Sequence, residues 1–223
     1  MIAEQLKKKP SSTFCLASGR TPKDAYAELA KLAKNKKISF SRAKFLQMDE
    51  YVGLKNKKNS LKNEIETMLL KKTNIKKQNC FFFNPEAQNL KKECFRFESL
   101  IKKKGIDFIL LGIGKNCHIA FNEPNTPFNS RTHITRLSEQ TRKANKALFK
   151  GEKTLVFSLT IGIKTILSAK KIVLIASGKN KICAVEKMLF GKINSRCPAS
   201  SLKKHKNVLV IITKDTMPKE KNQ

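Results

Sequence analysis

A histidine and a glutamate share one short polar segment within an otherwise apolar stretch of the sequence. The segment, residues 112–124, opens with glycine and contains Asn116, His118 and Glu123. A histidine can accept and donate a proton near neutral pH, and a nearby carboxylate can orient its ring and tune its pKa. A single histidine is more often structural. The concentration of polar residues at this place favours a proton-transfer site instead.

Two adjacent carboxylates, Asp49 and Glu50, follow a predicted strand at residues 44–48. The chain has only 17 acidic residues, so neighbouring acids at the end of a strand are uncommon in it. One of them could act as a general base. A helix N-cap or an ordinary surface loop explains the pair at least as well, and the pattern leaves these interpretations open.

A third segment has the composition of an anion-binding loop. Ser18, Gly19, Arg20 and Thr21 precede Pro22 and a helical pattern. A glycine turn that leads into a helix beginning with proline presents free backbone N–H groups to an anion, and the two hydroxyls add donors. An ordinary strand-to-helix turn is the alternative, and the residues alone favour neither.

Two cationic residues are candidates for holding a phosphate dianion. Arg142 lies near the start of a predicted helix, and Lys181 follows a predicted strand. Both residue types bind phosphate. Because the chain has 47 basic residues, composition alone does not single these two out.

The elements that must position these residues alternate along the chain. Short apolar runs predict strands, and apolar residues at helical spacing predict helices. The predicted strands cover residues 13–17, 44–48, 81–83, 107–112, 154–159, 171–177 and 207–213. The predicted helices cover residues 22–34, 60–70, 90–104, 138–149, 161–168 and 181–190, with Ser60 as the N-cap of the second.

This alternation predicts an α/β fold, a mainly parallel, Rossmann-like sheet flanked by helices on both faces. In such sheets ligands bind beyond the carboxyl ends of the strands, which is where all three polar loops fall. The sequence shows no repeats, linkers or boundaries rich in proline and glycine. We therefore expect residues 1–223 to form a single domain.

The formal charge of +30 raises the question of a nucleic-acid partner. Of the 47 basic residues 40 are Lys, spread almost evenly, and Trp is absent. A protein that reads DNA or RNA favours Arg interleaved with aromatic residues on one face. Codons rich in A and T explain the abundant Lys without a partner, so we expect no specific nucleic-acid binding.

Cysteine and histidine spacing argues against a metal site or a disulfide framework. The six cysteines form no Cys-x-x-Cys pair, and the three histidines lie at no ligand spacing from them. The first residues lack the order of a signal peptide, and no apolar run is long enough to span a membrane. We expect a cytoplasmic protein with reduced thiols, no metal and no membrane contact.

Six short segments stand in a fixed order along the chain. They are 16–22 (Leu-Ala-Ser-Gly-Arg-Thr-Pro), 48–54 (Met-Asp-Glu-Tyr-Val-Gly-Leu), 118–124 (His-Ile-Ala-Phe-Asn-Glu-Pro), 130–132 (Ser-Arg-Thr), 141–145 (Thr-Arg-Lys-Ala-Asn) and 159–162 (Leu-Thr-Ile-Gly). Together they resemble the signatures of the glucosamine-6-phosphate deaminase family over residues 12–217. The related 6-phosphogluconolactonases share the glycine–histidine loop but usually continue with a Thr-Ala-Ser-like run, so the segment 118–124 favours the deaminases.

The resemblance implies that glucosamine 6-phosphate and water give fructose 6-phosphate and ammonia, without a metal or organic cofactor. It implies that His118 opens the pyranose ring, supported by Asn116 and Glu123. It implies that Asp49 takes a proton from C2 and returns it at C1. The same resemblance assigns the phosphate of the substrate to Ser18, Gly19, Arg20, Thr21, Arg142 and Lys181.

Two positions in the histidine loop depart from the family pattern. Many members have Asp where this chain has Asn116, although Asn also occurs there in the shorter bacterial forms. Asn can orient His118 but cannot share a proton, so any relay rests on Glu123. Cys117 replaces a glycine that is usual in the loop. If the backbone has a positive φ there, the Cβ costs about 1 kcal/mol.

The longer members of the family carry an allosteric site for N-acetylglucosamine 6-phosphate. The matching region of this chain departs from that pattern at Thr126, His133, Thr135 and Arg136. We therefore expect a short form without control by that ligand, either monomeric or a small homo-oligomer. The chain also begins short of the family's usual first strand, which predicts a truncated strand at that edge of the sheet.

Three other functions remain as alternatives to the deaminase. The first is a weakened or inactive homologue that still binds sugar phosphates, and the second is a hydrolase like the 6-phosphogluconolactonases. The third, more distant, is a basic nucleic-acid-binding protein.

Overall fold

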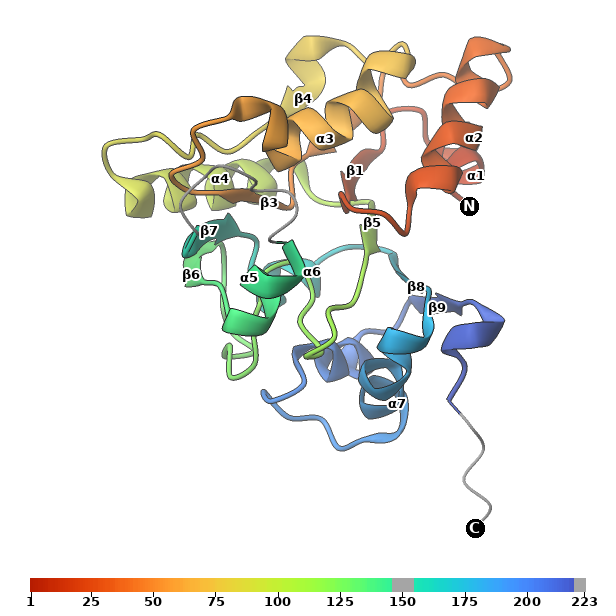
Figure 1. Ribbon diagram of the computed structural model, residues 1–223. Helices are drawn as coiled ribbons and strands as arrows, with labels where there is room; N and C mark the ends of the chain where they lie inside the picture. The colour runs from red at the N-terminus through yellow and green to blue at the C-terminus, as the bar shows by residue number, and fades with distance from the viewer. Residues whose placement is uncertain (146–154, 219–223) are drawn as a thin grey trace.

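The computed structural model describes residues 1–145 and 155–218, and its strands form two sheets (Figure 1). The strands are β1 (Thr13–Leu16), β2 (Lys44–Leu46), β3 (Asp49–Tyr51), β4 (Cys80–Phe81), β5 (Phe108–Leu111), β6 (His133–Arg136), β7 (Phe157–Thr160), β8 (Ile172–Ala176) and β9 (Val208–Ile212). The α-helices are α1 (Ile2–Lys8), α2 (Lys23–Lys34), α3 (Leu61–Met68), α4 (Leu90–Lys104), α5 (Glu139–Asn145), α6 (Ile163–Ile166) and α7 (Ile182–Phe190).

The larger sheet has the strand order β4-β2-β1-β5-β8-β9, and every neighbouring pair in it is parallel. This confirms the predicted α/β class with a mainly parallel sheet. Its central strands are continuous apolar runs such as Phe108–Leu111, buried along their whole length, because both faces of a parallel sheet are covered by helices.

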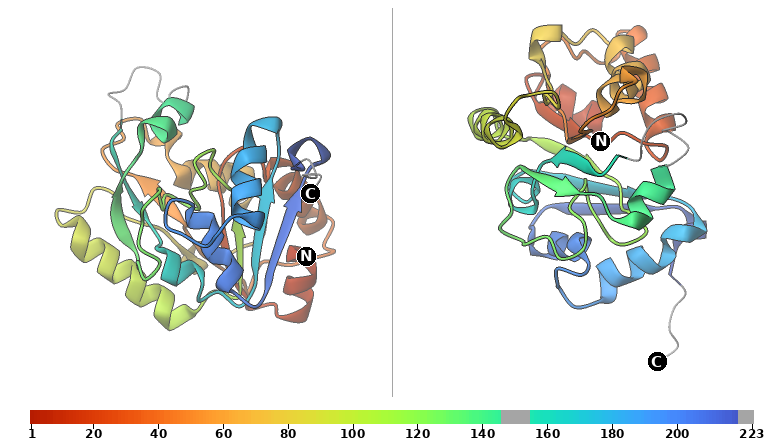
Figure 2. Two further views of the ribbon diagram at one scale, coloured as in Figure 1. Left: turned by 90° about the horizontal axis from the view of Figure 1, so that it is seen from below. Right: turned by 60° about the vertical axis from the view of Figure 1, so that its left-hand side comes forward.

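Two hydrophobic clusters lie on the two faces of the larger sheet. Phe14 and Leu16 of β1 pack with α1, α2 and α3 on one face, whereas Cys15 packs with α4, α6 and α7 on the other. Successive side chains of a strand point to opposite faces, which explains the division. The right-hand view of Figure 2 shows α2 and α3 on one side of the strands and α7 on the other.

The predicted helix at 90–104 matches α4 at both ends. The side chain of Asn89 accepts a hydrogen bond from the N–H of Lys92 at 3.0 Å, and Gly105 ends the helix with a φ of 68°. Ser60 caps α3 through its Oγ, which accepts from the N–H of Asn63 at 3.0 Å, so that prediction is confirmed as well.

A second, three-stranded antiparallel sheet of order β3-β7-β6 differs from the sequence-based expectation. The predicted strand at 44–48 ends at Leu46, and Asp49–Tyr51 then forms β3 in this second sheet. Helix α1 is likewise not predicted by the sequence patterns. The predicted helix at 138–149 and strand at 154–159 extend into residues 146–154, which lie outside the described residues.

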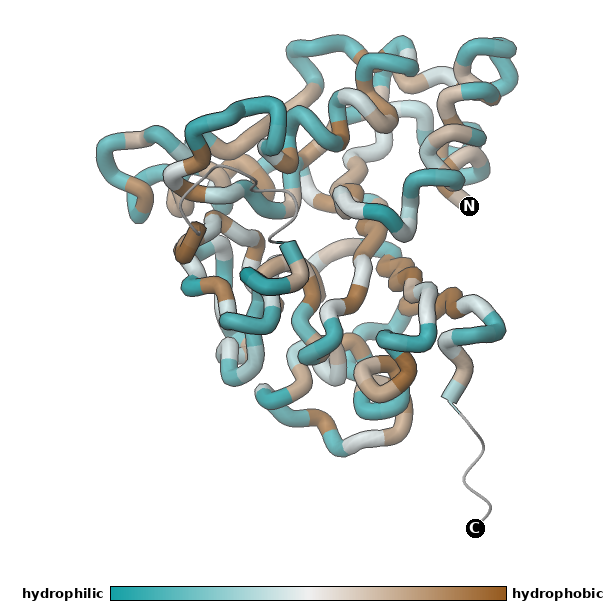
Figure 3. Tube along the Cα trace, in the orientation of Figure 1, coloured by the Kyte–Doolittle hydropathy of each residue, from teal (hydrophilic) through white to brown (hydrophobic). Residues whose placement is uncertain are grey.

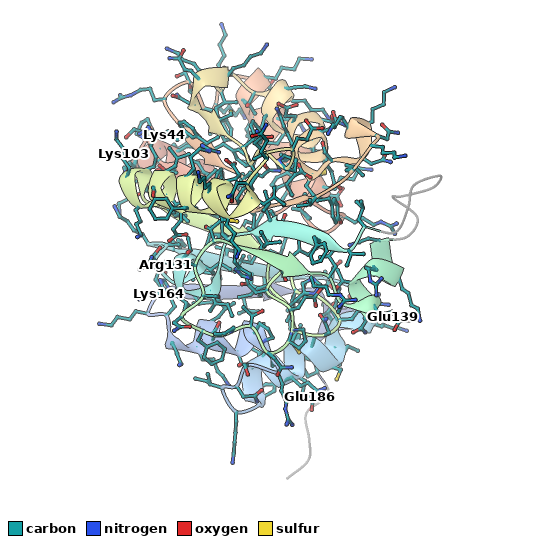
Figure 4. The ribbon with its side chains drawn as sticks, turned by 90° about the vertical axis from the view of Figure 1, so that its left-hand side faces the viewer. Lys44, Lys103, Arg131, Glu139, Lys164 and Glu186 are labelled. Atoms are coloured by element: carbon teal, nitrogen blue, oxygen red, sulfur yellow. The ribbon has the colours of Figure 1, made fainter. Side chains whose placement is uncertain are left out.

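Hydrophilic side chains cover the outside of the molecule. Figure 3 shows hydrophobic residues concentrated along the strands and hydrophilic ones along the outer loops and helix turns. Figure 4 shows lysine side chains extending outward around the outline, among them Lys44, Lys103 and Lys164. The positive charge is therefore spread over several elements rather than gathered on one of them.

Candidate active site

Three loops that carry candidate residues, those of Gly19, His118 and Lys181, begin at the carboxyl edge of the larger sheet. They follow β1, β5 and β8, which are adjacent strands, and the N–H of Ala17 donates to the carbonyl of Leu110 at 3.0 Å. From β1 the chain continues to β2, which lies on one side of the β1–β5 pair. From β5 it leads to β8, which lies on the other side. Such a switch in direction opens a crevice between the two loops, and ligands of open α/β sheets bind there.

The loop after β5 is a tight turn built around His118. The N–H of Gly114 donates to the carbonyl of His118 at 2.9 Å, and the N–H of Cys117 donates to the carbonyl of Gly114 at 3.0 Å. A Cβ at position 114 would overlap the imidazole of His118. Glycine is therefore required for the ring to lie where it does.

Cys117 has a φ of 68° within this turn. The left-handed conformation costs a residue with a Cβ about 1–2 kcal/mol. The carbonyl of Cys117 accepts from the N–H of Ala199 at 3.0 Å, and its side chain is buried in the core. These contacts hold the backbone in a conformation that glycine would adopt without cost.

Glu123 lies beside His118 and is held by several donors. Its Oε2 lies 3.6 Å from Nδ1 of His118 and accepts from Nδ2 of Asn116 at 2.6 Å. Its Oε1 accepts from the N–H of Ser138 at 3.2 Å. Burial alone would raise the pKa of Glu123, but hydrogen bonds and charge from His118, together with Thr141 and Asn116, lower the pKa to about 2. The carboxylate is therefore ionised at neutral pH and can stabilise an imidazolium at His118.

Asp49 lies on β3 of the second sheet, a strand that is linked to the histidine loop. It pairs with Thr160 of β7, and Oγ1 of Thr160 accepts from the N–H of Phe121 at 3.0 Å. The ring of Phe121 lies with its centroid 5.4 Å from Tyr51 and 6.2 Å from His118. Strand β3 and the histidine loop are thus joined through Thr160 and Phe121.

Burial, followed by the charges of Glu50 and Glu64, raises the pKa of Asp49 to about 8. Its carboxyl group is therefore mostly protonated at neutral pH in the ligand-free protein. A cation placed beside it would favour the ionised form. Asp49 can thus become a base when a positively charged group enters the site.

The neighbouring carboxylate, Glu50, has a structural role. It accepts from the N–H groups of Leu61 and Lys62 at the start of α3, at 3.0 and 2.9 Å, and from Nε2 of Gln47 at 2.9 Å. It therefore holds the N-terminus of α3, one of the alternatives left open by the sequence. Asp49 remains as the candidate base of the pair.

The anion-binding candidate after β1 leads directly into α2. Gly19 has a φ of 97°, which residues with a side chain rarely adopt. The hydroxyl of Tyr26 donates to the carbonyl of Ala17 at 2.6 Å, which fixes α2 at the end of β1. The N-terminus of α2 therefore lies at the carboxyl edge of the sheet, where Pro22 has no N–H and the N–H of Lys23 donates to the carbonyl of Arg20 at 3.2 Å.

The two cationic candidates lie on elements that flank the histidine loop. Nζ of Lys181 donates to the carbonyl of Ile113 at 2.6 Å, and burial, followed by the charge of Lys115, lowers its pKa. Arg142 lies next to Thr141, whose Oγ1 is 3.4 Å from Nδ1 of His118. Nε of Arg142 is buried and has no hydrogen-bond partner among the described residues. Both cations would gain from an arriving anion.

Several residues at the site are not predicted by the sequence patterns. Ser138 and Thr141 contact the Glu123–His118 pair. Their sequence signals are a serine at the start of a predicted helix and the position of Thr141 in the segment 141–145, and neither assigns them to the site. Glu64 lies on α3, far along the chain from the loops it affects. Within residues 1–145 and 155–218, no three His, Cys, Asp or Glu side chains are grouped to hold a metal ion. No helix in these residues is long and apolar enough to cross a membrane.

A parallel α/β fold with a carboxylate-supported histidine and a second, protonated carboxyl at its crevice defines an enzyme of acid–base chemistry. Residues 1–211 match the family described as glucosamine-6-phosphate isomerases/6-phosphogluconolactonase. The chain belongs to this family.

Individual relatives agree with this assignment. The chain is 42% identical over 215 residues to a protein of Bacillus velezensis named glucosamine-6-phosphate deaminase, covering 95% of this chain and 89% of that protein. It is 43% identical over 225 residues to a protein of the same name from Clostridium botulinum, covering 99% and 92%.

Solved structures show the same relationship. A structure described as a monomeric glucosamine-6-phosphate deaminase superposes with a TM-score of 0.93 at 40% identity, covering 96% of this chain and 90% of that one. A 6-phosphogluconolactonase from Thermotoga maritima superposes with a TM-score of 0.73 at 21% identity, covering 95% and 88%. The latter similarity shows the shared fold alone.

Proposed function

We propose that the chain is a glucosamine-6-phosphate deaminase, which converts glucosamine 6-phosphate and water into fructose 6-phosphate and ammonia. The observation that carries the proposal is the arrangement of His118 against an ionised Glu123 while Asp49 keeps its proton. Two groups with opposite protonation states suit a reaction that both accepts and donates protons. The relatives of 40–43% identity named as deaminases support it.

Ring opening is the first step that the site can perform. His118 takes the proton of the C1 hydroxyl and returns a proton to the ring oxygen as the bond between C1 and that oxygen breaks. Glu123, ionised and hydrogen-bonded to Asn116, stabilises the charged imidazole that forms between the two transfers. The product of this step is the open-chain aldehyde.

Proton transfer from C2 to C1 follows at Asp49. The ammonium group of the substrate, placed beside Asp49, favours the ionised carboxylate, which then removes the C2 proton next to the aldehyde carbonyl. One proton of the ammonium group passes to the C1 oxygen, which gives a neutral enamine with a hydroxyl at C1. Returning the C2 proton at C1 then leaves a C2 iminium ion. Water adds to that carbon, ammonia leaves, and the ketone of fructose 6-phosphate remains.

The phosphate of the substrate would be held by the loop of Ser18, Gly19, Arg20 and Thr21, with Arg142 and Lys181 as cationic partners. The glycine turn at Gly19, two hydroxyls in the loop and two cations with unfavourable surroundings support this role. Fixing the phosphate positions C1 and C2 at the reacting groups.

The same proposal extends to the setting of the reaction. We propose a cytoplasmic enzyme of N-acetylglucosamine catabolism that acts as a monomer, in keeping with the solved structure described as a monomeric deaminase.

The test is a pair of coupled assays on the purified chain. Ammonia and fructose 6-phosphate should appear in equal amounts from glucosamine 6-phosphate, and hydrolysis of 6-phosphogluconolactone should stay at the rate without protein. Absence of ammonia above the level of an Asp49→Asn variant would contradict the deaminase. Rapid lactone hydrolysis would instead point to the alternative activity, and sugar-phosphate binding without either product would indicate an inactive homologue.

A further inference from the structure

A hydroxyl group of α5 (Glu139–Asn145) lies against the imidazole ring of His118. Oγ1 of Thr141 is 3.4 Å from Nδ1 of His118, and Oε2 of Glu123 is 3.6 Å from the same nitrogen. Thr141 is only 4% exposed, so water has little access to this contact. The ring therefore has two polar neighbours at Nδ1, a buried hydroxyl and a carboxylate, and the hydroxyl is the nearer of the two.

The hydroxyl of Thr141 is itself held in place by other side chains. Oγ of Ser138 donates to Oγ1 of Thr141 at 3.0 Å and accepts from Nδ2 of Asn116 at 3.2 Å. The same amide donates to Oε2 of Glu123 at 2.6 Å. Asn116 therefore fixes both neighbours of the ring, the carboxylate directly and the hydroxyl through Ser138.

Helix capping does not account for the hydroxyl of Thr141. The cap of α5 is Ser138, whose Oγ accepts from the backbone N–H of Thr141 at 3.2 Å. That bond uses the backbone of Thr141 and does not require its side chain. The contact with His118 is therefore what a threonine provides at this position and a valine would not.

The neighbours of Nδ1 decide which nitrogen of the neutral ring carries the proton. Glu123 is ionised at neutral pH and can only accept hydrogen bonds, and the oxygen of Thr141 can accept one as well. A proton on Nδ1 suits both neighbours, and it leaves the free lone pair on Nε2. Ring opening needs such a lone pair to take the proton of the C1 hydroxyl.

We propose that Thr141 is a positioning residue for ring opening: its hydroxyl, held by Ser138, fixes Nδ1 of His118 and so directs the lone pair of Nε2 to the substrate. The proposal rests on the proposed function in assigning ring opening to His118. Thr141 acts through the ring rather than on the sugar, so its loss slows turnover and leaves substrate binding intact.

Steady-state kinetics of Thr141→Val test this role. The variant keeps the size and branching of the side chain but removes the hydroxyl, so kcat should fall about three- to tenfold, the effect of one lost hydrogen bond. KM should change less than about twofold. Thr141→Ser restores the hydroxyl and should recover most of kcat. Thr73→Val is the matched control, because its hydroxyl donates to the carbonyl of Leu70 at 3.1 Å, outside the candidate site.

Nuclear magnetic resonance of isotope-labelled histidine rings tests the positioning without turnover. When the ring of His118 is neutral, the unmodified chain should show the tautomer with the proton on Nδ1, and Thr141→Val should show a mixture of the two tautomers. The chain has three histidines, and the signals lost in His118→Gln identify the ring. Circular dichroism establishes that each variant is folded. Unchanged tautomers in Thr141→Val, or a Thr141→Ser variant as slow as Thr141→Val, would overturn the proposal.

The two proposals fail in different ways. If the unmodified chain releases no ammonia but Thr141→Val changes the tautomers of His118, the deaminase assignment fails and the positioning of the ring stands. If ammonia is released and Thr141→Val matches the unmodified chain in kcat, the positioning role fails and the deaminase stands.

Discussion

Nδ1 of His118 lies 3.6 Å from Oε2 of Glu123, and the same oxygen accepts from Nδ2 of Asn116 at 2.6 Å. The Glu123 carboxylate therefore lies between the imidazole of His118, which can accept and donate a proton, and the side-chain amide of Asn116, which cannot. Asn116 contributes a donor that fixes the carboxylate, while the charge that acts on His118 comes from Glu123.

Replacing Glu123 by Gln should slow turnover without weakening binding. The variant keeps the size of the side chain but removes the negative charge that stabilises an imidazolium at His118, so we expect kcat to fall about 10²-fold. KM should change less than about threefold, because Glu123 makes no contact with the phosphate loop. Steady-state kinetics measure both, with the exposed Glu139→Gln of α5 as the control. An unchanged kcat would remove Glu123 from the mechanism.

Asp49→Asn should abolish deamination and preserve binding. The amide cannot accept the C2 proton, so kcat should fall about 10²–10⁴-fold. Binding of an unreactive sugar phosphate, such as a 2-deoxy analogue, should remain within a few-fold by calorimetry. Activity near that of the unmodified chain would mean that another group is the base.

The same variant should also change how stability depends on pH. The pKa of Asp49 is raised from 3.8 to about 8 by burial first and by neighbouring acids second, so the folded protein holds a proton that the unfolded chain releases. Such a group costs stability that grows as pH rises from its unfolded to its folded pKa. As the pH rises from 5 to 8, the free energy of unfolding of Asp49→Asn should therefore rise relative to that of the unmodified chain, by on the order of 1 kcal/mol for each pH unit. Urea unfolding at each pH measures the gain, and a constant difference would contradict the raised pKa.

Cys117 offers a test of backbone strain. At an ordinary position Gly is less stable than Ala by about 0.5–1 kcal/mol. Cys117 has a φ of 68°, so Cys117→Gly relieves strain that Cys117→Ala keeps, while both lose the buried thiol. We expect the Gly variant to be at least as stable as the Ala variant in urea unfolding. If the Ala variant were clearly more stable than the Gly variant, as at an ordinary position, the turn would not be strained.

Lys181 should contribute to phosphate binding rather than to chemistry. Lys181→Met keeps the apolar stem but removes the cation, and we expect KM for glucosamine 6-phosphate to rise about 10–100-fold, in line with a lost charged hydrogen bond. The fall in kcat should be smaller. Lys179→Met removes an exposed cation on the same turn and serves as the control. A similar KM for both variants would remove Lys181 from the phosphate site.

The sequence predicts the larger sheet well because its strands carry a signal of their own. Phe108–Leu111 and Ile172–Ala176 are continuous apolar runs, which parallel strands covered on both faces require. Strand β3 has no such signal, since Asp49 and Glu50 are charged and the strand is only three residues long. Strand β3 forms because it pairs with β7. This pairing is a tertiary contact, which no local sequence pattern predicts.

The same distinction applies to the candidate site, where the sequence predicts some of the functional residues and not others. Asn116, His118 and Glu123 are close in sequence, so residue type and spacing are enough to predict that they act together. The role of Glu50 as the anchor of α3 depends on a contact across 11 residues with Leu61. This contact arises from packing. Sequence spacing alone cannot distinguish Glu50 from an ordinary surface acid.

Thr160 of β7 pairs with Asp49 of β3 on one side and with His133 of β6 on the other. Its hydroxyl accepts a hydrogen bond from the N–H of Phe121. The candidate base is therefore carried by the small sheet, while the phosphate loop is carried by the large one. If the phosphate and the reacting carbon of the substrate are held as proposed, the substrate extends from one sheet to the other. We therefore expect the distance between its two binding points to depend on how the two sheets pack, and so on buried residues between them such as Leu159.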